Sequence, residues 1–213
     1  MYTKGWGVEK DYKKAAEWYR KVAEQGVSGV QFIVGAMYEK GDGVEQNYTE
    51  AAEWYRKAAE QGNATAQCKL GIMCEEGQGV EQNDAEAATC YRKSADQNVP
   101  EAQFNLGIMY EEGQGVEQND IEATEWYRKA ASQGIPAAQF KLGLRYEEGR
   151  GIERNNVRAA EWYQRAAEQG QLARNLAKRI GEELDIPVYC YENAAFKPER
   201  RNLASCRSGE YEA

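Results

Sequence analysis

Hydrophobic and polar residues alternate along this chain with the spacing of amphipathic helices that lie in pairs. In residues 64–76, Ala66, Leu70, Met73 and Cys74 stand at positions i, i+4, i+7 and i+8, which places them on one face of a helix. We call this kind of helix helix A. In residues 51–59, alanine, tryptophan and tyrosine cover two adjoining stripes of a second helix, helix B. Two apolar stripes require neighbours on two sides, so the pattern predicts stacked helix pairs.

The pattern recurs with a constant step of 36 residues. Residues 17–26 are repeated almost unchanged at 53–62, and weaker copies begin at Thr89, Glu125 and Glu161. A second block shows the same step, with copies at 37–44, 73–80, 109–116 and 145–152 and an earliest copy at 1–8. A step that does not vary predicts a row of similar stacked units.

The residues at the expected helix ends are of types that favour the start or the end of a helix. Pro100 and Pro136 fall in the first turn of later copies of helix A, where a missing N–H costs little. The Gly-x-Gly segment at 77–79 is expected to end helix A as a structural turn, because phosphate-binding glycine loops open a helix and do not close one. Asn83 is expected to cap helix B, and Glu86 to return the hydrogen bond.

Residues 102–116, Ala-Gln-Phe-Asn-Leu-Gly-Ile-Met-Tyr-Glu-Glu-Gly-Gln-Gly-Val, are followed at 123–131 by Ala-x-Glu-Trp-Tyr-x-Lys-Ala-Ala. This combination resembles the Sel1-like repeat family, which is related to the tetratricopeptide repeats. The resemblance covers residues 1–170, with a truncated first unit. It implies an all-α fold, a right-handed superhelical solenoid of antiparallel helix pairs, and a function as a non-enzymatic adaptor or scaffold for protein partners.

The resemblance also implies a binding surface, because helix A lines the concave groove in the tetratricopeptide architecture. By that analogy the candidate partner-binding residues are Phe32, Ala36, Lys40, Thr65, Ile72, Glu76, Glu101, Phe104, Ile108, Glu111, Glu112, Phe140, Leu144, Glu147 and Glu148. Gly29, Glu39, Cys68, Glu75 and Ala137 lie on the same stripe. Such a surface suits an extended or helical peptide with apolar anchors and basic groups. Alternatively, the three phenylalanines pack between helices, since apolar spacing cannot separate groove from core.

Charge narrows the class of partner. The net charge is −8, and residues 27–134 contain 8 Lys or Arg against 19 Asp or Glu, a net charge of −11. Nucleic acids and anionic lipids are bound through Lys and Arg, so neither is expected as a partner. The chain has no histidine, which removes the usual general base and the commonest metal ligand. We therefore expect no catalytic residues, no metal and no cofactor.

Two residue types need an interpretation of their own. Cys68, Cys74 and Cys90 stand where sister repeats have Phe, Tyr and Trp. One interpretation is that the three cysteines form a redox or metal cluster. The other is that they are small buried thiols in a more loosely packed repeat. We favour the second, because no Cys-x-x-Cys spacing is present. The tryptophans at 18, 54, 126 and 162 are expected to fill the core.

The repeat ends at Gly170. Leu172, Leu176, Ile180 and Leu184 form one apolar stripe, so residues 171–184 are expected to be a capping helix. Residues 186–191 form a strand-like apolar run, and residues 185–213 are expected to be a weakly ordered tail. Residues 172–213 resemble an internal segment of glutamate formiminotransferase, which transfers a formimino group to tetrahydrofolate.

That second resemblance implies an alternative function, a fragment of a folate-linked transferase that needs other chains for activity. The family uses a proposed catalytic histidine, which this chain lacks. Whether the segment is a grafted or a truncated remnant stays open. Saturable folate binding would distinguish the transferase alternative from a scaffold.

The expected location is the cytoplasm. No stretch approaches the roughly 18 apolar residues of a membrane span, and the first residues do not form a secretion leader. Met1 aligns with Met37, so helix B of the first unit would expose one stripe. Two outcomes are open at that end: a longer native protein, or self-association through Trp6, Trp18 and Tyr19. The strand-like run at 186–191 is a second candidate for self-association.

Overall fold

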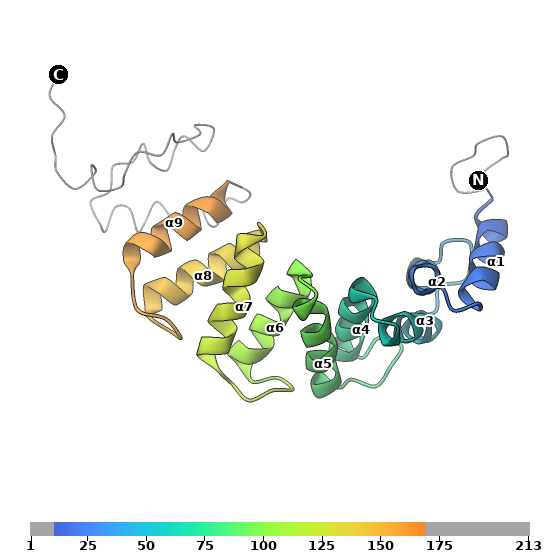
Figure 1. The fold of residues 1–213 in the computed structure, drawn as a ribbon, viewed down its shortest axis with the longest axis horizontal. Helices are drawn as coiled ribbons and strands as arrows, with labels where there is room; N and C mark the ends of the chain where they lie inside the picture. Colours follow the sequence, from blue (N-terminus) through green and yellow to red (C-terminus); the bar gives the residue numbers. More distant parts are fainter. Residues whose placement is uncertain (1–10, 169–213) are drawn as a thin grey trace, which may run out of the picture. The chain divides into compact units, whose positions relative to one another are not determined.

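The structure, a computed structural model, describes residues 11–168 (Figure 1). Within that range the chain forms nine α-helices and no strand. It divides after Lys129 into two compact units. In the part of the chain that is described, no helix is both long enough and apolar enough to cross a membrane. The cytoplasmic location expected from the sequence stays a prediction.

Helices of the two expected kinds alternate along the chain. The first unit holds α1 (Tyr12–Ala23), α2 (Ser28–Lys40), α3 (Tyr48–Glu60), α4 (Ala64–Glu76), α5 (Asp84–Asp96) and α6 (Pro100–Glu112). The division falls within α7 (Asp120–Ser132), and the second unit holds α8 (Pro136–Glu148) and α9 (Asn156–Ala167). Helices α2, α4, α6 and α8 are helix A, and the odd-numbered helices are helix B. The predicted helix at 64–76 is confirmed, whereas the predicted cap at 171–184 and tail at 185–213 lie outside the described residues.

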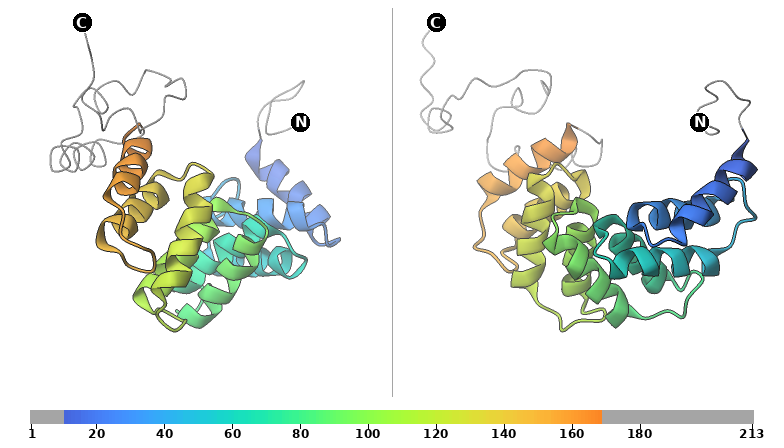
Figure 2. Two further views of the ribbon diagram at one scale, coloured as in Figure 1. Left: turned by 60° about the vertical axis from the view of Figure 1, so that its left-hand side comes forward. Right: turned by 45° about the vertical axis from the view of Figure 1, so that its right-hand side comes forward.

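Neighbouring helices pack on each other in chain order. In the first unit the contacts run from α1 to α2 and on to α6, and in the second α8 packs on α9. The pairs α2 with α3 and α4 with α5 lie side by side in both views of Figure 2. A solenoid of helix pairs follows from this order, because α3 and α5 each contact the helix A before them and the helix A after them.

The helix B copies α3, α5, α7 and α9 begin directly after an asparagine that caps them. Asn83 Oδ1 accepts a hydrogen bond from the Glu86 amide at 3.0 Å, and Asn47, Asn119 and Asn155 cap their helices in the same way. The predicted return bond from Glu86 is wrong. Its carboxylate instead accepts from Arg56 Nη1 at 2.7 Å, because the neighbouring helix B brings a charged donor to it.

The Gly-x-Gly segment connects α4 to α5 and contacts α3 of the preceding pair. Gly77 closes α4 in the left-handed conformation, at φ +68°. Gly79 also has a positive φ, and a Cβ there would lie only 2.2 Å from the carbonyl carbon of Tyr48. The loop therefore packs backbone to backbone on the first turn of α3. The predicted structural turn is confirmed, and the second glycine is required for contact as well as for conformation.

Tyrosines of helix B fill the core. Tyr55, Tyr91, Tyr127 and Tyr163 are each 0% exposed. Each ring lies over a glycine in the middle of helix A, at positions 35, 71, 107 and 143, where a Cβ would approach the ring to 2.7–2.8 Å. Glycine inside a helix costs about 0.5–1 kcal/mol relative to alanine. Here the missing side chain leaves space for a buried aromatic ring, which offsets that cost.

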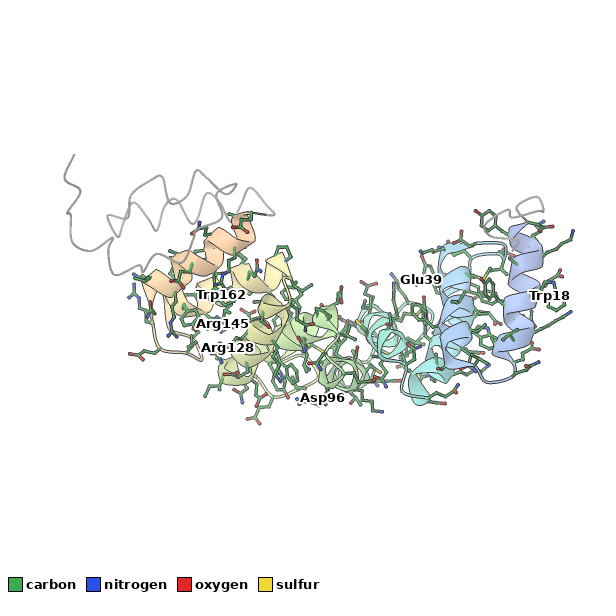
Figure 3. The ribbon with its side chains drawn as sticks, turned by 45° about the horizontal axis from the view of Figure 1, so that its top comes forward. Trp18, Glu39, Asp96, Arg128, Arg145 and Trp162 are labelled. Atoms are coloured by element: carbon green, nitrogen blue, oxygen red, sulfur yellow. The ribbon has the colours of Figure 1, made fainter. Side chains whose placement is uncertain are left out.

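The tryptophans divide between core and surface. Trp54 and Trp126 are 6% and 5% exposed, so the core prediction is confirmed for them, and Trp162 is half-buried. For Trp18 the prediction is wrong, because its side chain is 58% exposed on the outer side of α1 (Figure 3). Trp54 packs with Ala23 of α1 and Val34 of α2, whereas no helix among the described residues covers Trp18 in that way.

Candidate protein-binding surface

The predicted binding residues lie along one stripe of each helix A, which we call the helix A stripe. Its exposed members are Lys40, Thr65, Glu76, Glu101, Glu112 and Glu148. Its half-buried members are Phe32, Ala36, Ile72, Phe104, Ile108, Glu111, Phe140, Leu144 and Glu147. None of the candidate residues is fully buried. The stripe therefore offers apolar side chains with an accessible edge next to exposed carboxylates.

The phenylalanines of the stripe combine the two roles that the sequence left open. The Phe32 ring centre lies 5.5 Å from that of Tyr55, and Phe104 and Phe140 lie 5.8 Å and 5.4 Å from Tyr127 and Tyr163. These tilted pairs hold each phenyl ring against helix B. Because the rings are only half-buried, each keeps an edge at the surface.

Two consecutive carboxylates that look equivalent in the sequence have different surroundings. The Tyr91 hydroxyl donates to Glu75 at 2.5 Å and the Tyr163 hydroxyl to Glu147 at 2.7 Å. Tyr55 and Tyr127 donate in the same way to Glu39 and Glu111. The second glutamates, Glu76, Glu112 and Glu148, stay exposed. The sequence analysis did not foresee this bond, although the constant spacing of 16 residues between carboxylate and tyrosine was a signal for it.

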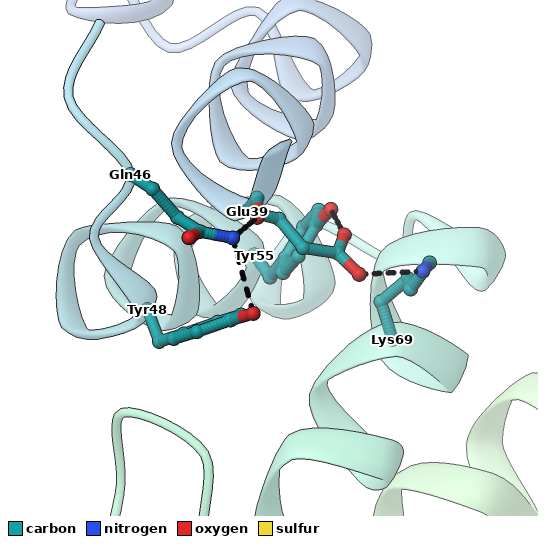
Figure 4. Close-up of polar contacts among 5 residues, drawn as sticks. All are labelled: Glu39, Gln46, Tyr48, Tyr55 and Lys69. Atoms are coloured by element: carbon teal, nitrogen blue, oxygen red, sulfur yellow. Dashed lines mark hydrogen bonds and ion pairs between the residues drawn. The ribbon is translucent and has the colours of Figure 1, made fainter. Parts of the chain in front are cut away.

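Glu39 carries a second contact from the next helix A. Lys69 Nζ lies 2.9 Å from Glu39 Oε1, while the Tyr55 hydroxyl occupies Oε2 (Figure 4). Burial acts to raise the pKa of Glu39, but the hydrogen bonds from Tyr55 and Lys69 outweigh it and hold the pKa below its usual value. Burial and the adjacent carboxylate raise the pKa of Tyr55 well above its usual value. This glutamate therefore stays ionised and paired, and links α2 to α3 and α4.

The three cysteines of residues 64–99 are buried thiols. Cys68, Cys74 and Cys90 are 6%, 0% and 9% exposed and form no disulfide. Burial, and then the charge of Glu101, raises the pKa of Cys68 to about 11. Burial and then Glu86 raise the pKa of Cys74 to about 11, and both also raise that of Cys90. These surroundings disfavour the thiolate that redox and metal chemistry require.

We expect slow alkylation of the three buried cysteines. In a Cys190→Ser/Cys206→Ser background at pH 8, iodoacetamide should label Cys68 and Cys74 at least about a hundredfold more slowly than an unfolded thiol, because a thiol with a raised pKa is seldom ionised. Peptide mass spectrometry over time measures the rates, and 6 M guanidinium chloride should restore fast labelling. Rapid labelling of native Cys68 would contradict the buried-thiol assignment.

Two hollows of the described surface are lined by residues outside the helix A stripe. One of about 600 Å³ is bordered by Arg92, Tyr110 and Glu122, and one of about 200 Å³ by Lys13, Val34 and Tyr38. Neither includes a candidate binding residue. Within residues 11–168, no group of three or more His, Cys, Asp or Glu side chains is placed to hold a metal ion.

Comparison with known proteins identifies relatives of the repeat region. The Sel1 repeat pattern matches residues 1–27, 29–63, 64–99, 100–135 and 136–171. The structure is similar to a Sel1 repeat protein from Oxalobacter formigenes, with a TM-score of 0.81, 36% identity, and coverage of 91% of this chain and 81% of that one. It is also similar to c5321, a protective antigen of uropathogenic Escherichia coli strains with an SLR fold, at a TM-score of 0.82 and 36% identity. That comparison covers 86% of this chain and 40% of c5321.

The C-terminal part has different relatives. The N-terminal subdomain of the formiminotransferase domain matches residues 160–213. Glutamate formimidoyltransferases from Streptococcus pyogenes serotype M1 and Thermoplasma acidophilum are 45% and 52% identical over 42 residues. The match takes in 20% of this chain and spans only 14% of the length of either relative.

Proposed function

Because the chain belongs to the Sel1 repeat family, we propose that it is a non-enzymatic scaffold that binds a peptide or protein partner along its helix A stripe. Proteins of this family generally bind other proteins. The observation that supports the site is the periodic surface itself. Half-buried apolar groups such as Ile72 and Ile108 recur beside exposed carboxylates such as Glu76 and Glu112, 36 residues apart.

The chemistry of this stripe fits a partner segment with apolar anchors and basic groups. Apolar side chains with an accessible edge provide contacts whose burial drives association. The carboxylates beside them favour Lys and Arg, and they disfavour nucleic acid and anionic lipid as partners. Affinity capture followed by mass spectrometry is the direct route to the partner.

We expect the exposed glutamates to set the rate of association. In the triple variant Glu76→Gln/Glu112→Gln/Glu148→Gln, affinity for the captured partner at low salt should fall about tenfold, mainly through slower association, because exposed pairs contribute about 0.2–1 kcal/mol each. The difference should shrink at high salt. Surface plasmon resonance at several salt concentrations measures both effects.

A matched control removes the same charge elsewhere. Glu45, Glu81 and Glu117 are also exposed and also 36 residues apart, but they lie on the loops after helix A. Their triple Gln variant should bind like the wild type. Equal loss of affinity in both variants would show that net charge, and not the helix A stripe, governs binding. Glu111 and Glu147 are left out of the design because they also bind buried tyrosines.

Self-association is a separate proposal and rests on Trp18. Its counterparts Trp54 and Trp126 are covered by neighbouring helices, whereas Trp18 is 58% exposed, so a second copy could pack against this face of α1. Tyr19 instead packs against the cluster of Ala23, Val34 and Trp54, and Trp6 and residues 186–191 lie outside the described residues. Light scattering of the wild type and of Trp18→Ala tests it, and equal masses at all concentrations would contradict it.

We do not extend the proposal to folate-linked transfer. The transferase resemblance spans 42 residues, and the relatives are about seven times longer than that segment. Of the residues that match the transferase subdomain, only 160–168 are described, and they form the end of α9 and its C-cap residue, Glu168. The chain also has no histidine to serve as the base.

A further inference from the structure

One carboxylate of the helix A stripe already binds a lysine within the chain. Lys69 of α4 reaches back to α2, where its Nζ lies 2.9 Å from Glu39 Oε1. The other oxygen of Glu39 accepts the Tyr55 hydroxyl, so both oxygens of the carboxylate are occupied (Figure 4). The stripe can therefore hold an ammonium group between two successive copies of helix A.

The equivalent carboxylate one repeat later has no such lysine. Glu75 stands 36 residues after Glu39, and its Oε2 accepts the Tyr91 hydroxyl at 2.5 Å, as in the preceding repeat. The position equivalent to Lys69 is Asn105, whose side chain hydrogen-bonds with Tyr91. Among the described residues, no Lys or Arg forms an ion pair with Glu75.

Residues of α4 and α6 near Glu75 and Asn105 in the sequence suit the stem and the charge of a lysine. Glu75 and Asn105 are half-buried, and the half-buried Ile72 and Ile108 come from the same two helices. The long methylene stem of a lysine packs well on such apolar side chains while its charged end stays at the carboxylate. Glu76 and Glu101 are exposed on these helices and add negative charge. The charge and the apolar surface both complement a lysine.

We propose that Glu75 is the specificity position of the helix A stripe, and that it selects partner segments with a lysine adjacent to an apolar anchor. The ammonium of the partner takes the place at Glu75 that Lys69 takes at Glu39. This inference rests on the proposed function, because it presumes that partners bind along the helix A stripe. It adds a requirement that the general acidic character of the surface does not impose: one lysine, at one position.

The test exchanges residues that the fold already accommodates. Asn105→Lys should supply the missing ammonium from within the chain and so occupy Glu75. Asn105→Gln is the matched control, since it lengthens the side chain without adding charge. Circular dichroism and thermal melting establish that both variants fold like the wild type.

The probe is a 12-residue peptide selected on immobilised wild-type protein from a displayed random library, synthesised with its lysine or with norleucine in its place. Norleucine keeps the stem and removes the charge. For the wild type and for Asn105→Gln, the norleucine peptide should bind about five- to tenfold more weakly than the lysine peptide. For Asn105→Lys, the lysine peptide should lose the same factor, and the two peptides should bind equally.

The outcomes separate this inference from the proposed function. Selected peptides without a recurring lysine, or equal lysine preference in Asn105→Lys and wild type, would overturn the role of Glu75 while peptide binding along the stripe stands. If the selected peptides bind equally well to the Glu76→Gln/Glu112→Gln/Glu148→Gln protein, the helix A stripe is not their site, and the proposed function fails with the inference.

Discussion

The Gly79→Ala variant is expected to melt roughly 8–16 °C below the wild type, whereas Gly77→Ala should melt only about 2–4 °C below it. The two glycines stand two residues apart in one loop, and both have a positive φ, +70° and +68°. A left-handed alanine costs about 1 kcal/mol at either position. Conformation alone therefore predicts nearly equal effects.

The difference comes from what the added methyl group would meet. At Gly77 the nearest atom is the Cβ of Gln82, at 3.3 Å, so a shift of a few tenths of an ångström is enough to accommodate the methyl group. At Gly79 the nearest atoms are the carbonyl carbon and oxygen of Tyr48, at 2.2 and 2.3 Å, and these belong to the backbone of α3. The loop must separate from α3, so we estimate a total cost of about 4 kcal/mol.

Thermal unfolding followed by circular dichroism measures both variants. Gly62→Ala is a second control, because Gly62 has a φ of +83° and no atom within 4 Å of the added Cβ. It should behave like Gly77→Ala. Similar melting temperatures for Gly79→Ala and Gly62→Ala would mean that the loop does not pack on α3 as described.

The second large effect is expected at Trp54. Replacing Trp54 by Ala should destabilise the protein by about 3–5 kcal/mol, because a large buried ring is lost and a cavity remains between α1, α2 and α3. Trp18→Ala should stay within about 0.5 kcal/mol of the wild type, since that ring is 58% exposed. Chemical denaturation of both variants at low protein concentration gives the two free energies of unfolding.

Fluorescence provides an independent check on the same pair. Loss of Trp18 should remove emission that iodide quenches readily, and loss of Trp54 should remove emission that iodide hardly reaches. Equal destabilisation by the two substitutions would contradict the placement of Trp18 at the surface. The comparison is closely matched, because residues 17–26 and 53–62 differ at a single position.

The local structure was predictable because its causes are local. The helix at 64–76 follows from apolar spacing, its end from Gly77, and the start of α5 from Asn83. In each case the stabilising contact forms between residues a few positions apart. The 36-residue step then indicated a stack of such units, and the Sel1 resemblance followed from the same residues.

Part of the candidate surface could also be predicted from the sequence. A helical period separates an apolar face from a polar one, so the stripe with Ile72 and Glu76 was predictable. The period does not tell which of two consecutive glutamates meets the next helix. Only the structure shows that Glu75 binds Tyr91 while Glu76 stays exposed. That distinction decides which carboxylates can be exchanged without disturbing the core.

The sequence by itself determined the helices, their caps and their repetition, since these depend on residues within one or two turns of each other. Tertiary structure alone decided the rest: that Trp54 is covered and Trp18 is not, that Gly79 touches the backbone of α3, and that Lys69 neutralises Glu39. These are contacts between residues some 30 positions apart. Trp18 and Trp54 therefore have different environments within nearly identical local sequences, because burial depends on the neighbouring helix.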